Sequence, residues 1–483
     1  MLKLANAVLV LAFVSVLCAG TAHAQWQYLG TPPTKPVDPN CSTFVFPCYT
    51  PVNSTPRFMA WMRAAYDPLD KQILIYANNP YCCVDASNSL FLLNTANAVA
   101  KGTVNLSDGS VWTLKWSNND HNQAQGAPIA ITSISRTNNV VTVNVASPGT
   151  RVRPGEYVVI WNVSDPSFNG TFLVASTPNA PPETQFTYNQ VGPNAGPILN
   201  IGTAGGPTDG PHQPTDREPY HQMTWDTTRN FLWQFGGDAY GASYPGSKKP
   251  YCSDCEAEDL YAFDFTQPQV VATQFCGNFT GKCGAPHVEE GALVYDPTTD
   301  TIVWFGGLVW GTQVNDTYEY HIATNTWTHT CTATACIGGG LPPAVRNREG
   351  LVFDPVAGVV VMFGGKGRYG VTLNDTWAYS TTTHRWTKLA SVNNPVGAQF
   401  PVIDWDPDRQ SVVYIAPNSP AQVWELTSVS VNSGTAIWSN LNVATGPTLS
   451  SLWANNYGAY DQNAHRFVIF IYPYAQVWDV QLP

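Results

Sequence analysis

Residues 346–390 read RNREGLVFDPVAGVVVMFGGKGRYGVTLNDTWAYSTTTHRWTKLA. The pair Asp354-Pro355 predicts a turn, because an Asp side chain accepts hydrogen bonds from its own backbone and proline presets φ. The apolar run that follows predicts a strand buried on both faces, and Gly364-Gly365 ends it. The stretch as a whole predicts four short strands, at residues 348–353, 359–363, 374–379 and 384–389.

An aromatic residue followed by Asp and then a turn recurs along the whole chain. The later pairs recur every 52 to 70 residues. That period suits a unit of four short strands, which is too small to bury its own faces and repeats into a closed array. The six pairs are Tyr66-Asp67, Trp225-Asp226, Tyr295-Asp296, Phe353-Asp354, Trp405-Asp406 and Tyr460-Asp461.

The unit resembles the kelch repeat, whose marks are a diglycine after the second strand and spaced Tyr and Trp in the third and fourth. Gly236-Gly237, Gly306-Gly307 and Gly364-Gly365 carry the diglycine, while the other three units lack it. The resemblance implies an all-β fold, a six-bladed kelch-type β-propeller. It covers most of the chain outside residues 1–24 and a mid-chain insertion, in which a hidden seventh unit is the less favoured alternative.

The last unit has three strands, and the segment at residues 25–30 looks like its missing fourth. We therefore expect the N-terminal strand to close the ring, with Trp26 beside Trp478, which removes a free sheet edge. The expected domains are the closing strand and first blade at 25–118, an inserted small β-domain at 119–214, and the remaining blades at 215–483.

Composition and targeting signals limit the function classes. Only 12% of residues are charged, the net charge is −11, and no Lys/Arg cluster is present, which argues against nucleic-acid binding. Residues 1–24 read as a signal peptide, and no later apolar run is long enough to span a bilayer. We expect a monomer that is secreted, either extracellular or periplasmic.

Ten cysteines follow the signal peptide in close pairs, which favours disulfides in an exported protein. Cys252 and Cys255 also have redox or zinc spacing, but the motif lies in a predicted loop, so a structural bridge is preferred. The adjacent Cys82 and Cys83 could pair with each other or elsewhere. The pairs are Cys41 with Cys48, Cys82 with Cys83, Cys252 with Cys255, Cys276 with Cys283, and Cys331 with Cys336.

The insertion alternates short strands and turns, and Asn169-Gly170 predicts a tight turn. It resembles a small β-domain of phage tail and bacterial surface proteins, most clearly at residues 168–172. That resemblance implies a spacer or an adhesive module and no catalysis.

The five cysteine pairs and the insertion all fall in loops that follow a second or a fourth strand. With strands alternating in direction, these loops leave from one end of the strands, which we name the stapled face. Loops on a rigid scaffold often carry function, so this face is the predicted binding face. The alternative is that long loops accumulated there and needed bridges.

Three ionisable residues are predicted at the channel mouth on this face. With a one-residue shift at Glu290, the residues Glu290, Glu349 and His221 share one position of the repeat. Two carboxylates and an imidazole could bind a cation or act as acid and base. The alternative is a hydrated polar lining in which Arg348 neutralises a glutamate.

Aromatic residues in the loops after second strands suggest sugar binding, because sugar rings stack on aromatic faces while polar groups take the hydroxyls. Packing of these rings under neighbouring loops is the alternative. The predicted ligand-binding residues are Trp310, Tyr240, Tyr244, Tyr369 and Arg348.

We therefore expect a non-catalytic recognition module for a glycan or a surface protein. The alternative is an extracellular carbohydrate-active hydrolase, lyase or oxidase with its site at the channel mouth, served by Glu290, Glu349 and His221. Kelch propellers include copper-radical oxidases resembling galactose oxidase, but this chain has no comparable set of Tyr, His and Cys. No cofactor is predicted, and a bound metal ion stays open.

Overall fold

The structure is a computed structural model, and it is all-β, as predicted. It describes residues 25–30, 63–77, 89–104, 109–117, 125–126, 129–146, 150–152, 154, 157–178, 184–199, 202–205, 217–239, 255–256, 259–266, 270–276, 283–443, 446–449, 456–471 and 476–482. Within these ranges, none of the helices has the length and apolar character needed to cross a membrane. The α-helix α1 (Thr95–Lys101) lies between two strands of the first unit.

Six antiparallel units of four strands make up most of the described chain. The first contains β2 (Arg63–Asp67), β3 (Gln72–Ala77), β4 (Ser89–Leu93) and β5 (Trp112–Ser117). The second contains β16 (Met223–Asp226), β17 (Phe231–Phe235), β20 (Leu260–Asp264) and β21 (Val271–Cys276). The third contains β22 (Ala292–Asp296), β23 (Thr301–Phe305), β26 (Thr317–His321) and β27 (Thr326–Thr332), and β28 (Ala335–Cys336) extends it.

The other three units follow the same order. The fourth contains β30 (Gly350–Asp354), β31 (Val359–Phe363), β33 (Thr376–Ser380) and β34 (Arg385–Val392). The fifth contains β35 (Val402–Asp406), β36 (Ser411–Ala416), β37 (Gln422–Ser430) and β38 (Thr435–Asn440). The sixth contains β39 (Tyr457–Asp461), β40 (Arg466–Ile471), β41 (Gln476–Gln481) and, from the other end of the chain, β1 (Gln25–Gly30).

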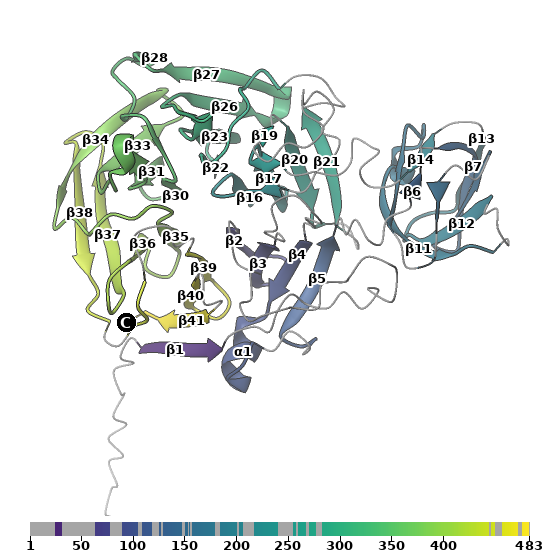
Figure 1. The fold of residues 1–483 in the computed structure, drawn as a ribbon, viewed down its shortest axis with the longest axis horizontal. Helices are drawn as coiled ribbons and strands as arrows, with labels where there is room; N and C mark the ends of the chain where they lie inside the picture. The colour runs from purple at the N-terminus through teal and green to yellow at the C-terminus, as the bar shows by residue number, and fades with distance from the viewer. Residues whose placement is uncertain are drawn as a thin grey trace, which may run out of the picture.

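The six first strands surround a common centre (Figure 1). Their contacts follow the order β2, β16, β22, β30, β35 and β39, and β39 contacts β2 again. This arrangement is compatible with a β-propeller. The fourth and fifth units are also joined by parallel pairing of β34 with β38, which makes one eight-stranded sheet.

The N-terminal strand β1 pairs antiparallel with β41, so the predicted closure is confirmed. Its register differs from the expected one. Trp26 lies opposite Val480, and it is Tyr28 that lies opposite Trp478, with their ring centroids 5.1 Å apart. The expected pairing of Trp26 with Trp478 is therefore wrong by two residues. Because side chains alternate between the faces of a strand, a shift of two residues leaves each side chain on the face it was expected to occupy, and Trp26 is buried.

The repeated Asp has one structural role in all six units. Its carboxylate accepts backbone N–H groups from the turn that follows the first strand, two and in most units also three residues further on. Each of these carboxylates is buried, and these bonds compensate part of the cost of burial. The six residues are Asp67, Asp226, Asp296, Asp354, Asp406 and Asp461.

The three diglycines link the second, third and fourth units each to the unit that follows. The second glycine of each pair donates its N–H to a carbonyl of the segment that enters the following unit, as in Gly307 to Arg346 at 2.9 Å. Gly307 has φ +92°, and a Cβ there would lie 2.6 Å from the carbonyl oxygen of Glu289. Only glycine fits both the backbone conformation and this close approach.

The insertion folds into a closed six-stranded barrel beside the ring (Figure 1), rather than into a seventh four-stranded unit. Asn169-Gly170 does not form the predicted tight turn. Instead a short 3-10 helix (Pro166–Phe168) precedes it, and the Asn169 carboxamide bonds back to the backbone of Val163. The barrel strands, in order around it, are β7 (Ile129–Thr137), β14 (Thr203–Gly205), β10 (Tyr157–Trp161), β11 (Gly170–Ser176), β12 (Gln185–Asn189) and β8 (Val140–Val145), and β13 (Ala195–Leu199) adds to the edge of β7.

Short strand pairs complete the described structure. They lie in the loops and in the chain leading to the second unit. The pairs are β6 (Gln125–Gly126) with β9 (Thr150–Arg151), β24 (Leu308–Val309) with β25 (Thr312–Gln313), and β29 (Arg346–Asn347) with β32 (Lys366–Gly367), and β15 (Arg217–Glu218), β18 (Asp238–Ala239) and β19 (Cys255–Glu256) form a small sheet.

Candidate functional site

Two of the predicted disulfides are present, Cys276–Cys283 and Cys331–Cys336. Each joins a cysteine near the end of a fourth strand, β21 or β27, to one in the segment that leads to the next first strand, which puts both on the stapled face. Disulfides of this kind are typical of proteins that fold outside the reducing cytosol.

The other three predicted bridges involve cysteine side chains that lie outside the described part of the chain. Cys41 and Cys48 both lie outside the described residues, so the bridge between Cys41 and Cys48 stays a prediction. The same holds for Cys82 with Cys83, and for Cys252 with Cys255, whose side chains are likewise outside the described part of the chain. The stapled face is therefore confirmed as the place of two bridges rather than of all five.

The strand register corrects one step of the sequence alignment. Opposite the phenylalanine that precedes each diglycine lies Ala292 in the third unit and Gly350 in the fourth. Glu290 and Arg348 each lie two residues before this position, so they are equivalent. The shift that aligned Glu290 with Glu349 is therefore wrong, because strand pairing preserves the six-residue distance to the turn Asp.

The residues at this position share a left-handed backbone. Tyr220, Glu290, Arg348 and Phe400 have φ of 49°, 53°, 63° and 56°. The N–H of Arg348 bonds to the carbonyl of Glu290 at 2.7 Å, and that of Phe400 bonds to the carbonyl of Arg348 at 2.8 Å. A left-handed conformation in a bulky residue costs on the order of 1–3 kcal/mol and persists only where its surroundings enforce it. For Glu290, Arg348 and Phe400 these N–H bonds between units contribute to that constraint.

The side chains from this position pack against one another across the centre of the ring. Tyr220 of the second unit stacks on Phe400 of the fifth, with centroids 6.0 Å apart, and the Arg348 guanidinium lies 5.0 Å from the centroid of Phe400. His221 meets the edge of Phe400 at 5.5 Å. We name Tyr220, His221, Glu290, Arg348 and Phe400 the central cluster, and all five residues are buried.

Glu290 and Arg348 form a two-pronged ion pair within the central cluster. The Arg348 Nε donates to Oε2 at 2.7 Å, and Nη2 donates to Oε1 at 2.5 Å. The carboxamide of Asn347 donates to Oε2 as well, and Gln313 from the neighbouring hairpin donates to Asn347 at 2.7 Å. The ion pair matches the alternative in which Arg348 neutralises a glutamate. The bonds from Asn347 and Gln313 connect this pair to the loops of the stapled face.

Glu349 and His221 are equivalent in the repeat, but their side chains do not meet. The His221 Nδ1 donates to the backbone carbonyl of Glu349 at 2.7 Å. The carboxylate of Glu349 is fully buried, and neither oxygen has a hydrogen-bond partner among the described residues. Burial raises the pKa of Glu349 well above its usual range, the charge of Glu290 adds to that rise, and Arg346 opposes it.

The three predicted catalytic residues thus do not present an open acid–base site. Their exposed fractions are 3% for His221, 5% for Glu290 and 0% for Glu349, so a substrate would reach them only if this packing opened. No cluster of three metal-ligating side chains occurs in the part of the chain that the structure describes. The roles proposed for these residues from sequence stay predictions.

Two predicted ligand-binding aromatics are exposed on hairpins of the stapled face. Trp310 lies at the turn between β24 and β25 with 69% of its surface exposed, and its ring lies 5.0 Å from that of His287. Tyr369 lies in the loop after β32 and is 99% exposed. Tyr240 and Tyr244 lie outside the described residues.

These two hairpins are joined at their bases. The Gln313 carboxamide donates to the Lys366 carbonyl at 2.8 Å as well as to Asn347. The hairpins of the third and fourth units are therefore held relative to each other, because one side chain bonds to both.

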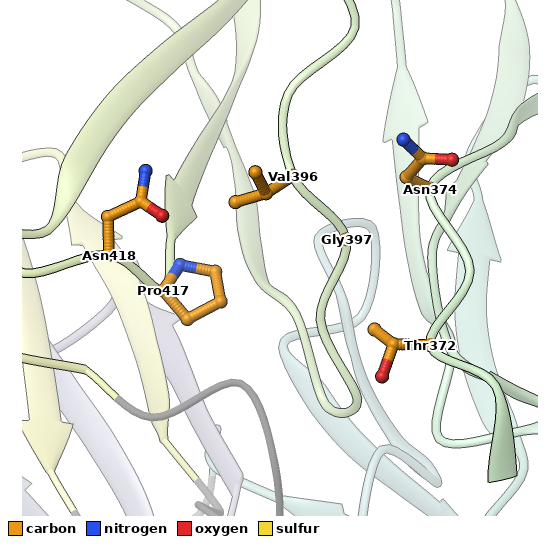
Figure 2. A pocket seen from close by; sticks show the side chains of 6 residues that line it. All are labelled: Thr372, Asn374, Val396, Gly397, Pro417 and Asn418. Carbon is orange, nitrogen blue, oxygen red and sulfur yellow. The ribbon is translucent and has the colours of Figure 1, made fainter.

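An open pocket of about 440 Å³ lies on the same face, where the fourth and fifth units meet. Figure 2 shows Thr372 and Asn374 on one side, Pro417 and Asn418 on the other, and the loop with Val396 and Gly397 between them. Sequence reasoning missed it, because its walls come from three separate loops. The one available signal was Ala416-Pro417, which replaces a diglycine in the fifth unit.

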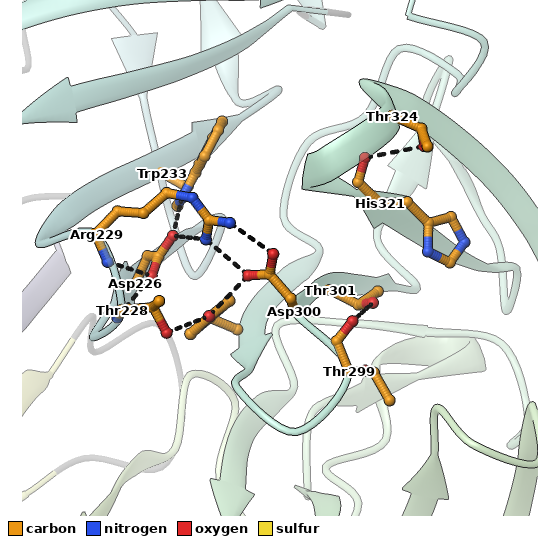
Figure 3. A network of polar contacts seen from close by, with 10 residues as sticks. Asp226, Thr228, Arg229, Trp233, Thr299, Asp300, Thr301, His321 and Thr324 are labelled. Atoms are coloured by element: carbon orange, nitrogen blue, oxygen red, sulfur yellow. Dashed lines mark hydrogen bonds and ion pairs between the residues drawn. The ribbon is translucent and has the colours of Figure 1, made fainter.

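The opposite face carries a polar network that joins the second and third units (Figure 3). Arg229 bonds to both oxygens of Asp300, at 2.6 and 2.5 Å, and to Asp226 at 2.9 Å. The Tyr295 hydroxyl donates to Asp300 at 2.9 Å. The bonds from Arg229 hold the pKa of Asp300 below its usual range. One guanidinium thus bonds to carboxylates from two units, Asp226 of the second and Asp300 of the third, so the network is a structural contact between them.

No protein-family model matches this sequence, and no curated protein is significantly similar to it. The kelch resemblance therefore depends on the repeated residues and on the order of the strands.

Proposed function

We propose that this protein is an exported, six-bladed kelch-type β-propeller that acts as a non-catalytic recognition module for a glycan or a surface protein. Six four-stranded units around one centre, the closing strand β1 and the linking diglycines support the propeller. The two disulfides and the predicted signal peptide at 1–24 support export.

The observation that carries the proposal is the exposure of Trp310 and Tyr369 on joined hairpins of the stapled face. Aromatic rings that a rigid scaffold holds exposed offer flat apolar surface on which a ligand can stack with little loss of conformational entropy. A sugar ring covers such a face with its C–H groups, while nearby amides and hydroxyls take its oxygens. We therefore put the glycan first among the two partner classes.

The alternative of catalysis at the channel mouth has less support. The central cluster fills this position with stacked rings and a paired glutamate. An acid–base pair needs a polar atom within reach of the substrate, and the side chains of His221, Glu290 and Glu349 are all buried.

The test is glycan-array binding and affinity retention of the protein lacking residues 1–24, compared with its Trp310→Ala and Tyr369→Ala variants. We expect each variant to bind about tenfold more weakly, which corresponds to about 1.4 kcal/mol for one aromatic contact. Val356→Ala is the control, since Val356 is 68% exposed on a turn of the opposite face. Unchanged binding by both aromatic variants would remove this surface from consideration, and an array that retains no protein would reject the glycan.

A further inference from the structure

We propose that the pocket between the fourth and fifth units is a subsite for one uncharged sugar residue. The inference depends on the proposed glycan-binding function and goes beyond it, by assigning a second binding position away from the exposed aromatics and a chemical class for what occupies it. Six residues line the pocket: Thr372, Asn374, Val396, Gly397, Pro417 and Asn418.

The size of the pocket limits its ligand. Binding pockets for small molecules have volumes of roughly 300–1,000 Å³. At about 440 Å³ this pocket is near the lower end, which suits a mono- or disaccharide unit rather than a long chain. The open side of the pocket leaves room for the rest of a glycan to continue along the face.

The wall formed by Thr372 and Asn374 is held in place by bonds to the loop opposite. Asn394 donates to the Asn374 carbonyl at 2.6 Å, and Gln399 donates to the Thr372 hydroxyl at 3.4 Å. Gly397 is required where these loops touch, because a Cβ there would lie 1.9 Å from the carbonyl oxygen of Leu373.

The other two loops are braced as well. The hydroxyl of Tyr414 donates to the Val396 carbonyl at 2.9 Å. The N–H of Leu449 donates to the Asn418 carbonyl at 3.2 Å. A pocket whose walls are already fixed binds its ligand with less loss of conformational entropy.

The polar groups of the lining match sugar hydroxyls. A carboxamide both donates and accepts hydrogen bonds, and so does a hydroxyl, on the protein and on the sugar alike. Asn374, Asn418 and Thr372 provide these groups from two sides of the pocket, as Figure 2 shows. Val396 and Pro417 offer apolar surface to the C–H face of a ring.

Charge selects against acidic sugars. None of the six lining residues is ionisable. A carboxylate that entered the pocket would lose water without gaining a cationic partner from the lining, which is costly. The net charge of −11 adds a weak repulsion over the whole surface.

The pocket is connected to the exposed aromatics through one loop. Lys366 and Thr372 form a β-bridge at the base of this loop, and Tyr369 is at its tip. One wall of the pocket and one exposed ring therefore belong to the same short segment, so a glycan stacked on Tyr369 has the pocket as the adjacent place to insert a further unit.

The experiment is ligand-observed saturation-transfer NMR on the protein lacking residues 1–24. The probes are glucose, galactose, mannose and N-acetylglucosamine, with glucuronic and galacturonic acid as acidic counterparts. At least one neutral sugar should bind with a Kd on the order of 1 mM, and its acidic counterpart about tenfold more weakly. Asn418→Ala and Thr372→Val should each weaken that binding about fivefold, as expected for one lost hydrogen bond. Asn463→Ala, an exposed asparagine on the opposite face, should not change it.

Each result has a separate consequence. If no neutral sugar binds, or if acidic sugars bind equally well, the subsite is rejected. If neutral sugars bind but both pocket variants bind as the unaltered protein does while remaining folded, the sugar lies elsewhere and the subsite is again rejected. Array binding that depends on Trp310 and Tyr369 would in either case leave the proposed function standing. An array that does not retain the unaltered protein rejects the glycan as its partner, and the subsite with it.

Discussion

The substitution Arg348→Met should destabilise the protein by about 3–5 kcal/mol, which is the usual cost of breaking a buried ion pair by removing one partner. Met approximates the length of the aliphatic part of Arg348, so the packing against Phe400 is partly kept. The cost then comes mainly from Glu290, whose carboxylate is left buried without its guanidinium.

The structure supports a value in that range. Both side chains of the pair are 7% exposed, and two bonds of 2.7 and 2.5 Å join them. Glu290→Gln in the same background should recover part of the loss, because a neutral amide no longer needs a cation. The coupling between the two substitutions should be on the order of 1–3 kcal/mol.

The assay is equilibrium unfolding in guanidinium chloride followed by tryptophan fluorescence, for the unaltered protein, both single variants and the double variant. Arg385→Met is the matched control: Arg385 is exposed, so its removal should change the free energy of unfolding by less than about 0.5 kcal/mol. A loss below about 1 kcal/mol for Arg348→Met would refute the reasoning. So small a loss would mean that water reaches the ion pair of Glu290 and Arg348, and catalysis at the channel mouth would then have to be reconsidered.

Three further predictions concern the fold. Trp26→Ala in the closing strand should cost about 3–5 kcal/mol, and Tyr28→Ala, whose ring is 45% exposed, clearly less, as measured by denaturant unfolding. Gly307→Ala should cost more than about 2 kcal/mol from strain and the clash with a carbonyl, while Gly311→Ala, which also has positive φ but nothing within 4 Å of its Cβ, should cost about 1 kcal/mol; equal losses would contradict the close-approach argument. Burial raises the pKa of Asp67 to about 6 from 3.8, so the folded state holds this proton more tightly than the unfolded state, and stability should fall as pH rises from about 4 to about 6. Asp67→Asn keeps an acceptor for the turn and removes the titrating group. It should therefore flatten the decline of the melting temperature between about pH 4 and about pH 6, and an unchanged decline would mean that other groups cause it.

Local features of the fold were predictable from the sequence. The turn after each aromatic-Asp pair, the apolar second strands and the need for glycine after them all depend on residues within one strand and its turn. The closing role of residues 25–30 followed from counting strands, although the register placed Tyr28, and not Trp26, beside Trp478.

The candidate site was less predictable. The one-residue shift at Glu290 was made so that Glu290-Gly291 would match Glu349-Gly350. Strand pairing instead conserves the six-residue distance from this position to the turn Asp, which makes Glu290 equivalent to Arg348. Sequence offered no sign that four bulky residues adopt positive φ. That conformation depends on contacts between units, such as the N–H bonds that join Glu290, Arg348 and Phe400. The parallel pairing of β34 with β38 likewise depends on how two packed units meet at their outer edges.

The amino-acid sequence by itself determined the all-β repeat, its turns and the glycines that end its second strands, because these follow from backbone preferences and from bonds that span a few residues. Only the tertiary structure decided that Tyr220 stacks on Phe400 across the ring, that Glu290 is neutralised by Arg348, and that three loops enclose a neutral pocket. These contacts join residues far apart in the chain, and their geometry depends on how the packed sheets are rotated and registered relative to one another.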